Sequence, residues 1–444
     1  MTKNIINTTV LVLFDSAALT LSLFISHGER LWLDRFSTFG DYDADIKRYA
    51  FSGLLYLLLL FLFYLYGLYN RRNDFWEESR IILQSVFFLF IFIATYVFVT
   101  KTSLEYSRAM VVLVFINMAW LLPIGRVASK HLLSRLRTWQ VNAYIEGDRH
   151  QAEKLRYDLM ANWFLGYRPV NSLKKAKIVF IATKNMPVEK LEKLIASYKK
   201  RMSEVVLIPY LSNISFANAE IVDLRIGRIS MVNIQNQLFK TKNRILKKIA
   251  ETLTVILLMP LFLIIFVLIA IWIKTDRRGP VLFCQKRLGE NGSIFECYKF
   301  RTMIEENEAV LKKYLEKNPD EAEYYAKYHK YRNDPRLTKA GRLLRKLSLD
   351  ELPQMINILK NEMSLIGPRP YMLSEKEKMG NAVETILHVK PGITGFWQIK
   401  GRNDLDFEER IELDNWYIQN WSLWLDFIIF IKTFEVLVTR RGAK

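Results

Sequence analysis

The sequence predicts a multi-domain membrane protein with four transmembrane helices, a small α/β Rossmann-like domain, and a mostly α-helical, membrane-associated domain that contains a re-entrant helix. Three observations predict this architecture. Four long apolar stretches come early in the 444-residue chain, and a segment with alternating strand and helix patterns follows them. A fifth apolar stretch with basic flanks opens the last third. The predicted domains are 1–138, 139–238 and 239–444, with the re-entrant helix at 249–274.

The composition narrows the class of protein. The chain is 51% hydrophobic and carries a net charge of +19. A basic soluble protein would suggest a nucleic-acid partner, whereas a basic and apolar chain indicates a membrane protein with cytoplasmic loops and an anionic ligand. Two cysteines, Cys284 and Cys297, are too few for a disulfide framework, and five scattered histidines give a zinc hydrolase no support. No cleavable signal peptide is evident in the N-terminal residues MTKNIINTTV.

The four early stretches are predicted to span the membrane. Each has about 16 to 20 residues, near the length needed to cross about 30 Å of hydrocarbon. The alternative, four buried helices of a soluble protein, is disfavoured because the run LLYLLLLFLFYLYGLY has no polar face. The stretches are Val10–Ser26, Ala50–Tyr69, Ile81–Thr100 and Met110–Gly125.

Basic residues predict the orientation of these spans. The loop 70–80 and the region 126–137 are rich in Arg and Lys, whereas the longer first loop offsets its basic residues with five acidic ones. By the positive-inside rule, the loop 70–80, the region after the fourth span and the N-terminus are cytoplasmic.

The fifth apolar segment, Leu253–Ile273, has cytoplasmic-type flanks on both sides. Pro260 lies within it, and a proline removes a helical hydrogen bond and kinks the helix. We therefore expect a helix that enters one leaflet and returns. The alternative is an ordinary proline-containing span, which membranes tolerate but which would place the last third of the chain outside the cell.

The middle domain alternates strands and helices, which predicts a parallel sheet. We expect strands at 141–147, 177–183 and 204–210 and an amphipathic helix at 187–201. The first strand is followed by Gly147 alone, without the GxGxxG turn that binds dinucleotides. A structural, regulatory or dimerising role is therefore favoured, and a homodimer is plausible.

The last third begins with a predicted hairpin at 279–303, whose turn is Gly289-Glu290-Asn291-Gly292. A charged helix at about 304–331, interrupted near Asn318-Pro319, follows. At the C-terminus, Trp416, Tyr417, Trp421 and Trp424 precede a short apolar run. They predict a helix lying on the cytoplasmic leaflet, with packing in a soluble core as the alternative.

The stretch SLDELPQ (348–354) places two adjacent carboxylates beside many basic residues. Ser348 and Glu351 match a capping box. Alternatively, Pro353 lies in the first turn of a helix and leaves Asp350 and Glu351 just ahead of it. Arginines clamp phosphate oxygens, carboxylates hold Mg²⁺, and a carboxylate can attack phosphorus. The pattern is typical of a site for a nucleotide diphosphate, although a basic surface facing anionic lipid has the same composition.

Three stretches resemble the bacterial sugar transferase family, the polyprenyl-phosphate hexose-1-phosphate transferases. They are KFRTM (299–303), SLDELPQMINILKNEMSLIGPRP (348–370) and KPGITGFWQIKGR (390–402). The resemblance covers about residues 239–444, and the four spans with an α/β domain resemble the long form of the family. It implies transfer of a sugar-1-phosphate, with galactose expected and glucose next, from a UDP-hexose to undecaprenyl phosphate with release of UMP. That reaction initiates O-antigen, capsule or exopolysaccharide synthesis.

The resemblance also implies roles for individual residues. Asp350 matches the nucleophile that carries a covalent phosphosugar, and Glu351 matches its partner in catalysis and Mg²⁺ binding. Arg369 matches a phosphate-binding arginine, and Pro260 the proline that breaks the re-entrant helix. Further anion-binding candidates are Lys299, Arg301 and Arg345. The resemblance implies a bacterial inner-membrane protein with its catalytic domain on the cytoplasmic face.

Two rival functions remain open at this stage. A glycosyltransferase would release UDP, but it would be expected to carry a DxD-type metal motif, and the last third offers Asp-Glu followed by Leu-Pro. A non-enzymatic scaffold would sense a ligand through its middle domain and would not require Asp350.

Overall fold

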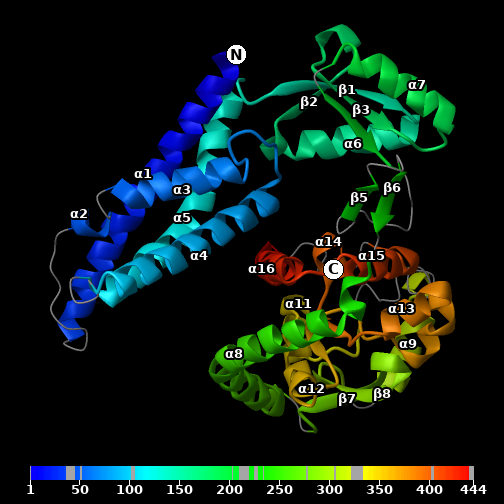
Figure 1. Ribbon diagram of the computed structural model, residues 1–444. Helices are drawn as coiled ribbons and strands as arrows, with labels where there is room; N and C mark the ends of the chain where they lie inside the picture. The colour runs from blue at the N-terminus through cyan, green and yellow to red at the C-terminus, as the bar shows by residue number, and fades with distance from the viewer. Residues whose placement is uncertain are drawn as a thin grey trace. The chain divides into compact units, whose positions relative to one another are not determined.

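The computed structural model describes residues 2–36, 46–50, 53–101, 106–202, 204–209, 220–224, 229–233, 235–276, 279–304, 307–321, 334–401 and 405–439. The chain forms two compact units, Met1–Tyr210 and Leu211–Lys444, and each is described by itself. The ribbon is shown in Figure 1.

The first unit begins with a bundle of apolar helices. Its helices are α1 (Thr2–Leu33), α2 (Ile46–Tyr49), α3 (Leu54–Leu65), α4 (Phe75–Val99) and α5 (Arg108–Arg135). Of these, α1, α4 and α5 are long and apolar enough to cross a membrane, as is α8 of the second unit. They correspond to the first, third and fourth predicted spans.

The second predicted span, Ala50–Tyr69, is a shorter helix than expected. Glycines with positive φ flank α3, Gly53 at 87° and Gly67 at 73°, so the helix has 12 residues. About 20 residues are needed to span the hydrocarbon core. The part of the chain that the structure describes therefore has four helices of spanning length, with α8 in place of segment 50–69.

Buried charges join the helices of this bundle. Asp15 of α1 accepts hydrogen bonds from Arg126 at 2.7 Å and from Tyr69 at 2.9 Å, and Glu78 pairs with Lys130. Arg126 and Lys130 were expected at a cytoplasmic surface, but they lie inside α5 and are about 1% exposed. A charged side chain is tolerated in apolar surroundings when it is paired with an opposite charge. The carboxylates of Asp15 and Glu78 therefore allow both side chains to be buried. Two of the basic residues that predicted a cytoplasmic location for region 126–137 therefore belong to internal ion pairs.

A parallel sheet completes the first unit. Its strands β1 (Val141–Gly147), β2 (Tyr167–Val170), β3 (Ile178–Ala182) and β4 (Glu204–Ile208) have the order β2-β1-β3-β4. Helices α6 (Arg149–Ala161) and α7 (Val188–Lys199) pack on opposite faces. The predicted strands and their parallel pairing are confirmed, while the short β2 was missed.

Side chains and backbone fill the end of this sheet where a nucleotide would enter. Gly147 has φ of 121°, and a Cβ there would lie 2.0 Å from the Ala182 carbonyl oxygen. Beside it, the Gln151 amide donates to the Ile208 oxygen at 3.1 Å and accepts from Lys184 N–H at 2.9 Å. The strand ends at which parallel sheets bind ligands are thus bonded to one another.

The second unit is mostly helical. Its helices are α8 (Thr241–Asp276), α9 (Asn307–Lys317), α11 (Lys339–Leu347), α12 (Met355–Leu359), α13 (Val383–Leu387), α14 (Phe396–Lys400), α15 (Phe407–Gln419) and α16 (Leu423–Thr439). Its strands form three pairs: antiparallel β5 (Glu220–Leu224) with β6 (Ile229–Asn233), antiparallel β7 (Leu282–Leu288) with β8 (Ile294–Phe300), and parallel β9 (Ser364–Ile366) with β10 (Gly392–Thr394).

Two sequence predictions are met here. The β7–β8 hairpin has the expected turn, in which Asn291 and Gly292 have positive φ. The charged helix ends at Lys317, next to the predicted interruption at Asn318-Pro319. The last part of that predicted helix, 322–331, lies outside the described residues.

Helix α8 carries Pro260 near its middle and exposes most of its apolar side chains. Its ribbon turns back on itself in Figure 1. Near its start, Lys247 pairs with Asp426 of α16 at 2.7 Å, and at its end the Asp276 carboxylate accepts from Ala340 N–H of α11 at 3.2 Å. Both ends of α8 therefore contact the same unit.

Candidate active site

The two candidate catalytic acids lie on a 3₁₀ turn, η7 (Leu349–Gln354), between α11 and α12. Ser348 ends α11 in the left-handed region, with φ of 55°, and its side chain does not cap the following turn. The capping-box alternative is therefore wrong. Asp350 and Glu351 lie ahead of α12, as the second alternative proposed, but Pro353 lies in η7 with them and not in the first turn of α12. A non-glycine residue in this region carries strain, which is common at functional sites.

Lys299 of β8 holds one of these acids. Its Nζ lies 2.7 Å from Glu351 Oε1, and both side chains are about a quarter exposed, at 24% and 29%. Burial alone would lower the pKa of Lys299, but the charges of Glu351 and Asp350 and the hydrogen bond to Glu351 hold it above its ordinary value. Lys299 therefore stays charged beside the two carboxylates.

Asp350 ionises less readily than an ordinary aspartate. Burial and then the adjacent Glu351 charge raise its pKa, while Lys299 and Arg345 oppose that rise. Arg345 of α11 donates from Nε to Thr302 Oγ1 at 3.0 Å, which aims its guanidinium from the helix toward the residues after β8. One strand, one helix and one turn thus bring Lys299, Arg345, Asp350 and Glu351 together.

Close backbone contacts set this arrangement. A Cβ on Gly341 of α11 would lie 2.1 Å from the Thr302 carbonyl oxygen, so only glycine lets the helix pack there. On the other side of η7, Asn357 donates to the Glu296 oxygen at 2.7 Å and accepts from Tyr298 N–H at 3.1 Å. The turn with the acids is therefore held against β8 from both ends.

The remaining predicted anion-binding residues occupy two other places. Arg301 directly follows β8, is 7% exposed, and donates its backbone N–H to the Val281 oxygen at 2.8 Å. Arg369 follows β9, in the loop between β9 and Tyr371. Its guanidinium lies 5.8 Å from the Trp397 ring centroid and 3.8 Å from Glu375.

Arg369 belongs to a group that the sequence analysis missed. Arg287 of β7 donates to the Pro370 oxygen at 3.0 Å, and the Arg410 guanidinium of α15 lies 5.5 Å from the Trp397 ring centroid. Strand alternation places Arg287 on the same hairpin face as Lys299, which was the available signal. Arg410 lacked any such signal, because its helix is far away in sequence.

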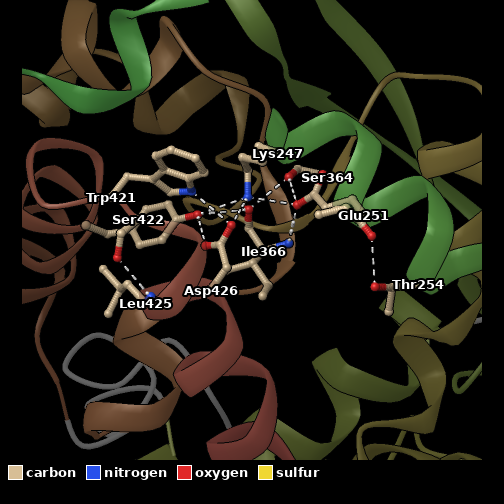
Figure 2. A network of polar contacts seen from close by, with 11 residues as sticks. Lys247, Glu251, Thr254, Ser364, Ile366, Trp421, Ser422, Leu425 and Asp426 are labelled. Atoms are coloured by element: carbon tan, nitrogen blue, oxygen red, sulfur yellow. Dashed lines mark hydrogen bonds and ion pairs between the residues drawn. The ribbon is translucent and has the colours of Figure 1, made fainter. Parts of the chain in front are cut away.

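A buried polar network joins the membrane helix to the C-terminal helices. Figure 2 shows Lys247 between Asp426 and Glu251, with Nζ distances of 2.7 and 2.8 Å. Glu251 accepts from Ser364 Oγ at 2.5 Å and from Ile366 N–H at 3.2 Å, next to the loop that carries Arg369.

Two aromatic residues predicted for the membrane interface belong to this interior instead. Tyr417 and Trp421 are 0% and 3% exposed and both donate to Asp426, at 2.7 and 2.9 Å. Trp416 stacks on Phe396, and Trp424 stacks on Phe427. The O–H of Tyr417 and the N–H of Trp421 supply hydrogen bonds to the buried Asp426 carboxylate. These two residues therefore pack in the protein core, which was the alternative prediction.

The acids fit a shared metal site better than a closed protein cage. Among the described residues, no cluster of three or more His, Cys, Asp or Glu side chains could hold a metal ion. Mg²⁺ in phosphoryl-transfer sites needs one or two carboxylates, with substrate phosphates and water completing its shell. The single carboxylate of Glu351 fits that donor set, which leaves Asp350 free of the metal.

Asp414 of α15 has a pH-dependent effect on stability. Its carboxylate is buried and accepts from Arg369 N–H at 3.1 Å and from Tyr371 O–H at 2.8 Å. Burial nevertheless raises its pKa from 3.8 to about 7. Between those values the folded state holds a proton that the unfolded state releases, so stability falls as pH rises from about 4 to about 7. The fall has an upper bound of about 4 kcal/mol.

We predict that Asp414→Asn removes this fall. In thermal melts of the solubilised protein, the melting temperature of the variant should gain on wild type as pH rises from 5 to 8. The same change at exposed Asp406, which caps α15, is the matched control and should preserve the wild-type pH dependence. A difference between Asp414→Asn and wild type that does not vary with pH would contradict the prediction.

Comparison with known proteins identifies the family. Residues 242–440 match the bacterial sugar transferase family. The chain is 32% identical over 403 residues to undecaprenyl-phosphate galactose phosphotransferase of Salmonella typhimurium, covering 84% of each chain. It is 32% identical over 283 residues to UDP-glucose:undecaprenyl-phosphate glucose-1-phosphate transferase of Escherichia coli, covering 61% of this chain and 57% of that one. It is 44% identical over 195 residues to the exopolysaccharide production protein ExoY of Rhizobium meliloti, covering 44% of this chain and 84% of that one. The chain belongs to the bacterial sugar transferase family and is a transferase enzyme.

Proposed function

We propose that this enzyme transfers a sugar-1-phosphate, with galactose as the expected sugar, from a UDP-hexose to undecaprenyl phosphate and releases UMP. The reaction would initiate O-antigen, capsule or exopolysaccharide synthesis. The observation that carries the proposal is the pair Asp350–Glu351, placed on a strained turn between two cations, Lys299 and Arg345. The relatives' names support a galactose or glucose donor and an undecaprenyl-phosphate acceptor.

The first step follows from the charges. The donor's diphosphate is anionic, so Lys299 and Arg345 would bind its oxygens and bring the sugar-linked phosphorus to the Asp350 carboxylate. An oxygen of Asp350 forms a bond to that phosphorus, the bond to the bridging oxygen breaks, and the electron pair leaves with UMP. Because a nucleophile must be ionised, Lys299 and Arg345 also serve by opposing the raised pKa of Asp350.

Two further features belong to this proposal. Glu351 would hold Mg²⁺, and a bound Mg²⁺ would neutralise charge on the diphosphate oxygens. Lys299 bonds Glu351 at 2.7 Å, so it orients that carboxylate before any substrate arrives.

We propose that α8 is re-entrant and that the catalytic unit lies on the cytoplasmic face of the inner membrane. A straight helix of its 36 residues would be about 54 Å long at about 1.5 Å per residue. Its two ends nevertheless bond to one unit, through Lys247–Asp426 and Asp276–Ala340. Pro260 lies between them and removes a hydrogen bond where the helix would turn.

We also propose three domains, 1–138, 139–238 and 239–444. The parallel sheet β1–β4 would form a Rossmann-like domain without a nucleotide, because Gln151 bonds across its strand ends. A structural or dimerising role suits that domain.

The nucleotide product tests the proposed reaction. With UDP-galactose, UDP-glucose, Mg²⁺ and undecaprenyl phosphate, the wild-type protein should release UMP, and Asp350→Asn should lower the rate at least about a thousandfold because the nucleophile is absent. Asp320→Asn, an exposed acid of the same unit, is the control and should retain activity. Release of UDP would identify a glycosyltransferase, and UMP release by Asp350→Asn at the wild-type rate would remove the proposed role of Asp350.

Cys284 reports on the topology of α8. It lies eight residues after the end of α8 and is exposed, whereas Cys297 is buried. A membrane-impermeant maleimide should label Cys284 in inside-out vesicles and leave it unlabelled in right-side-out vesicles, and Lys242→Cys in a Cys284→Ser background should behave in the same way. Labelling of Cys284 from the outer side would show that α8 spans the membrane.

A further inference from the structure

Arg287, Arg369 and Arg410 come from three separate parts of the second unit and meet at the loop after β9. The guanidinium carbons of Arg369 and Arg410 lie 5.8 and 5.5 Å from the centroid of Trp397. Arg287 reaches the same loop, since it donates to the oxygen of Pro370, the neighbour of Arg369. Burial and then the charge of Arg369 hold the pKa of Arg287 and Arg410 below the ordinary guanidinium value.

Nearby carboxylates only partly balance these three charges. Among the described residues, Glu375 is the single carboxylate within ion-pair distance of the cluster, at 3.8 Å from Arg369. Asp414, which accepts from the Arg369 backbone, has a pKa raised to about 7 and is therefore only partly charged at neutral pH.

Two guanidinium nitrogens of the cluster have unused hydrogen-bond donors. The Nε atoms of Arg287 and Arg410 are buried and have no hydrogen-bond partner within the part of the chain that the structure describes. Like charges that are brought together at a cost, with donors still unpaired, indicate a site that an anion completes.

One arginine of the cluster shares a face of the β7–β8 hairpin with Lys299, which bonds Glu351. Arg287 and Lys299 project from the same face of the β7–β8 hairpin, with the cross-strand pairs Phe283–Lys299 and Arg287–Phe295 four residues apart. Their Cα atoms are therefore about 13 Å apart along the hairpin, and two long side chains on the same face can reach across part of that distance. The Glu351 charge also slightly offsets the lowering of the Arg287 pKa, so the two groups lie within electrostatic range of each other.

We propose that Arg287, Arg369 and Arg410 form one phosphate subsite that holds the phosphate of UMP in the first half-reaction and the phosphate of undecaprenyl phosphate in the second. This inference rests on the proposed function. Entering and leaving oxygens of a phosphoryl transfer lie roughly in line through phosphorus. UMP departs opposite Asp350, and the acceptor must enter opposite the Asp350–phosphorus bond. Both phosphates therefore occupy the same side of the phosphorus in turn.

The second half-reaction balances without another reactant. A non-bridging oxygen of undecaprenyl phosphate forms a bond to the phosphorus of the phosphosugar. The Asp350–phosphorus bond breaks, and its electron pair returns to the carboxylate. No proton is transferred in this step. At the arginine cluster, the phosphate of undecaprenyl phosphate takes the place of the phosphate of UMP.

Competition binding tests the shared subsite without turnover. Labelled UMP would be bound to the full-length protein in detergent with Mg²⁺ and displaced with undecaprenyl phosphate. We expect displacement to follow a single shared site. Arg287→Gln and Arg410→Gln should each weaken both ligands by about tenfold or more, the effect of losing charge-assisted hydrogen bonds. Lys286→Gln is the matched control, because Lys286 is exposed and projects from the opposite hairpin face.

Each outcome separates the inference from the function on which it rests. Simultaneous binding of both ligands, or loss of only one ligand in the arginine variants, would overturn the shared subsite while leaving the transferase proposal intact. Melting temperatures near wild type would exclude misfolding as the cause of weak binding. Failure of the wild-type protein to bind either ligand, with no UMP release from a UDP-hexose, would overturn the proposed function itself.

Discussion

The second unit depends on one buried ion pair, Lys247–Asp426, and on the hydrogen bonds around it. Lys247 lies in the first turns of a membrane helix, and Asp426 lies in the helix that closes the chain. Removing one member of a buried pair leaves an uncompensated charge and costs roughly 3–5 kcal/mol. Glu251, one helical turn after Lys247, continues the network to Ser364 and Ile366 of β9. The pair thus connects the membrane segment with the strand that leads to Arg369.

The catalytic residues are held by backbone contacts as well as by charge. Gly341 lets α11 approach Thr302, and a Cβ on Gly395 or Gly367 would lie 2.4 or 2.7 Å from a carbonyl oxygen. Close approach of this kind leaves the loops around the site little freedom. A transferase that must hold a covalent phosphosugar between two half-reactions benefits from such rigidity, because the in-line geometry must be reproduced twice. The strain at Ser348 is consistent with the same requirement.

Local sequence patterns predicted many of the secondary-structure elements, because the conformations of these elements depend mainly on neighbouring residues. The parallel strands, the β7–β8 hairpin and the end of α9 follow from alternation, turn residues and Asn318-Pro319. Three features could not be predicted in this way. Segment 50–69 is apolar throughout, yet Gly53 and Gly67 shorten its helix. Arg126 and Tyr417 are buried because partners distant in sequence, Asp15 and Lys247, satisfy their polar atoms.

The site shows the same division between local and distant information. Asp350, Glu351, Lys299, Arg345 and Arg369 stand in stretches that carry the family resemblance. Arg410 and Asp414 lie on a helix whose sequence resembles an ordinary solvated helix. Their importance arises only when α15 packs beside the loop after β9, where Asp414 accepts from Arg369 and the Arg410 side chain lies near Trp397.

The central claim is a phosphosugar bound covalently to Asp350, and trapping that species tests it most directly. The protein would be incubated with UDP-galactose and Mg²⁺ without undecaprenyl phosphate, quenched, digested and analysed by mass spectrometry. The account predicts that the peptide containing Asp350 gains the mass of one hexose phosphate less water, and that adding the acceptor removes it. UMP release without any modified peptide, or modification of a different residue, would contradict the account.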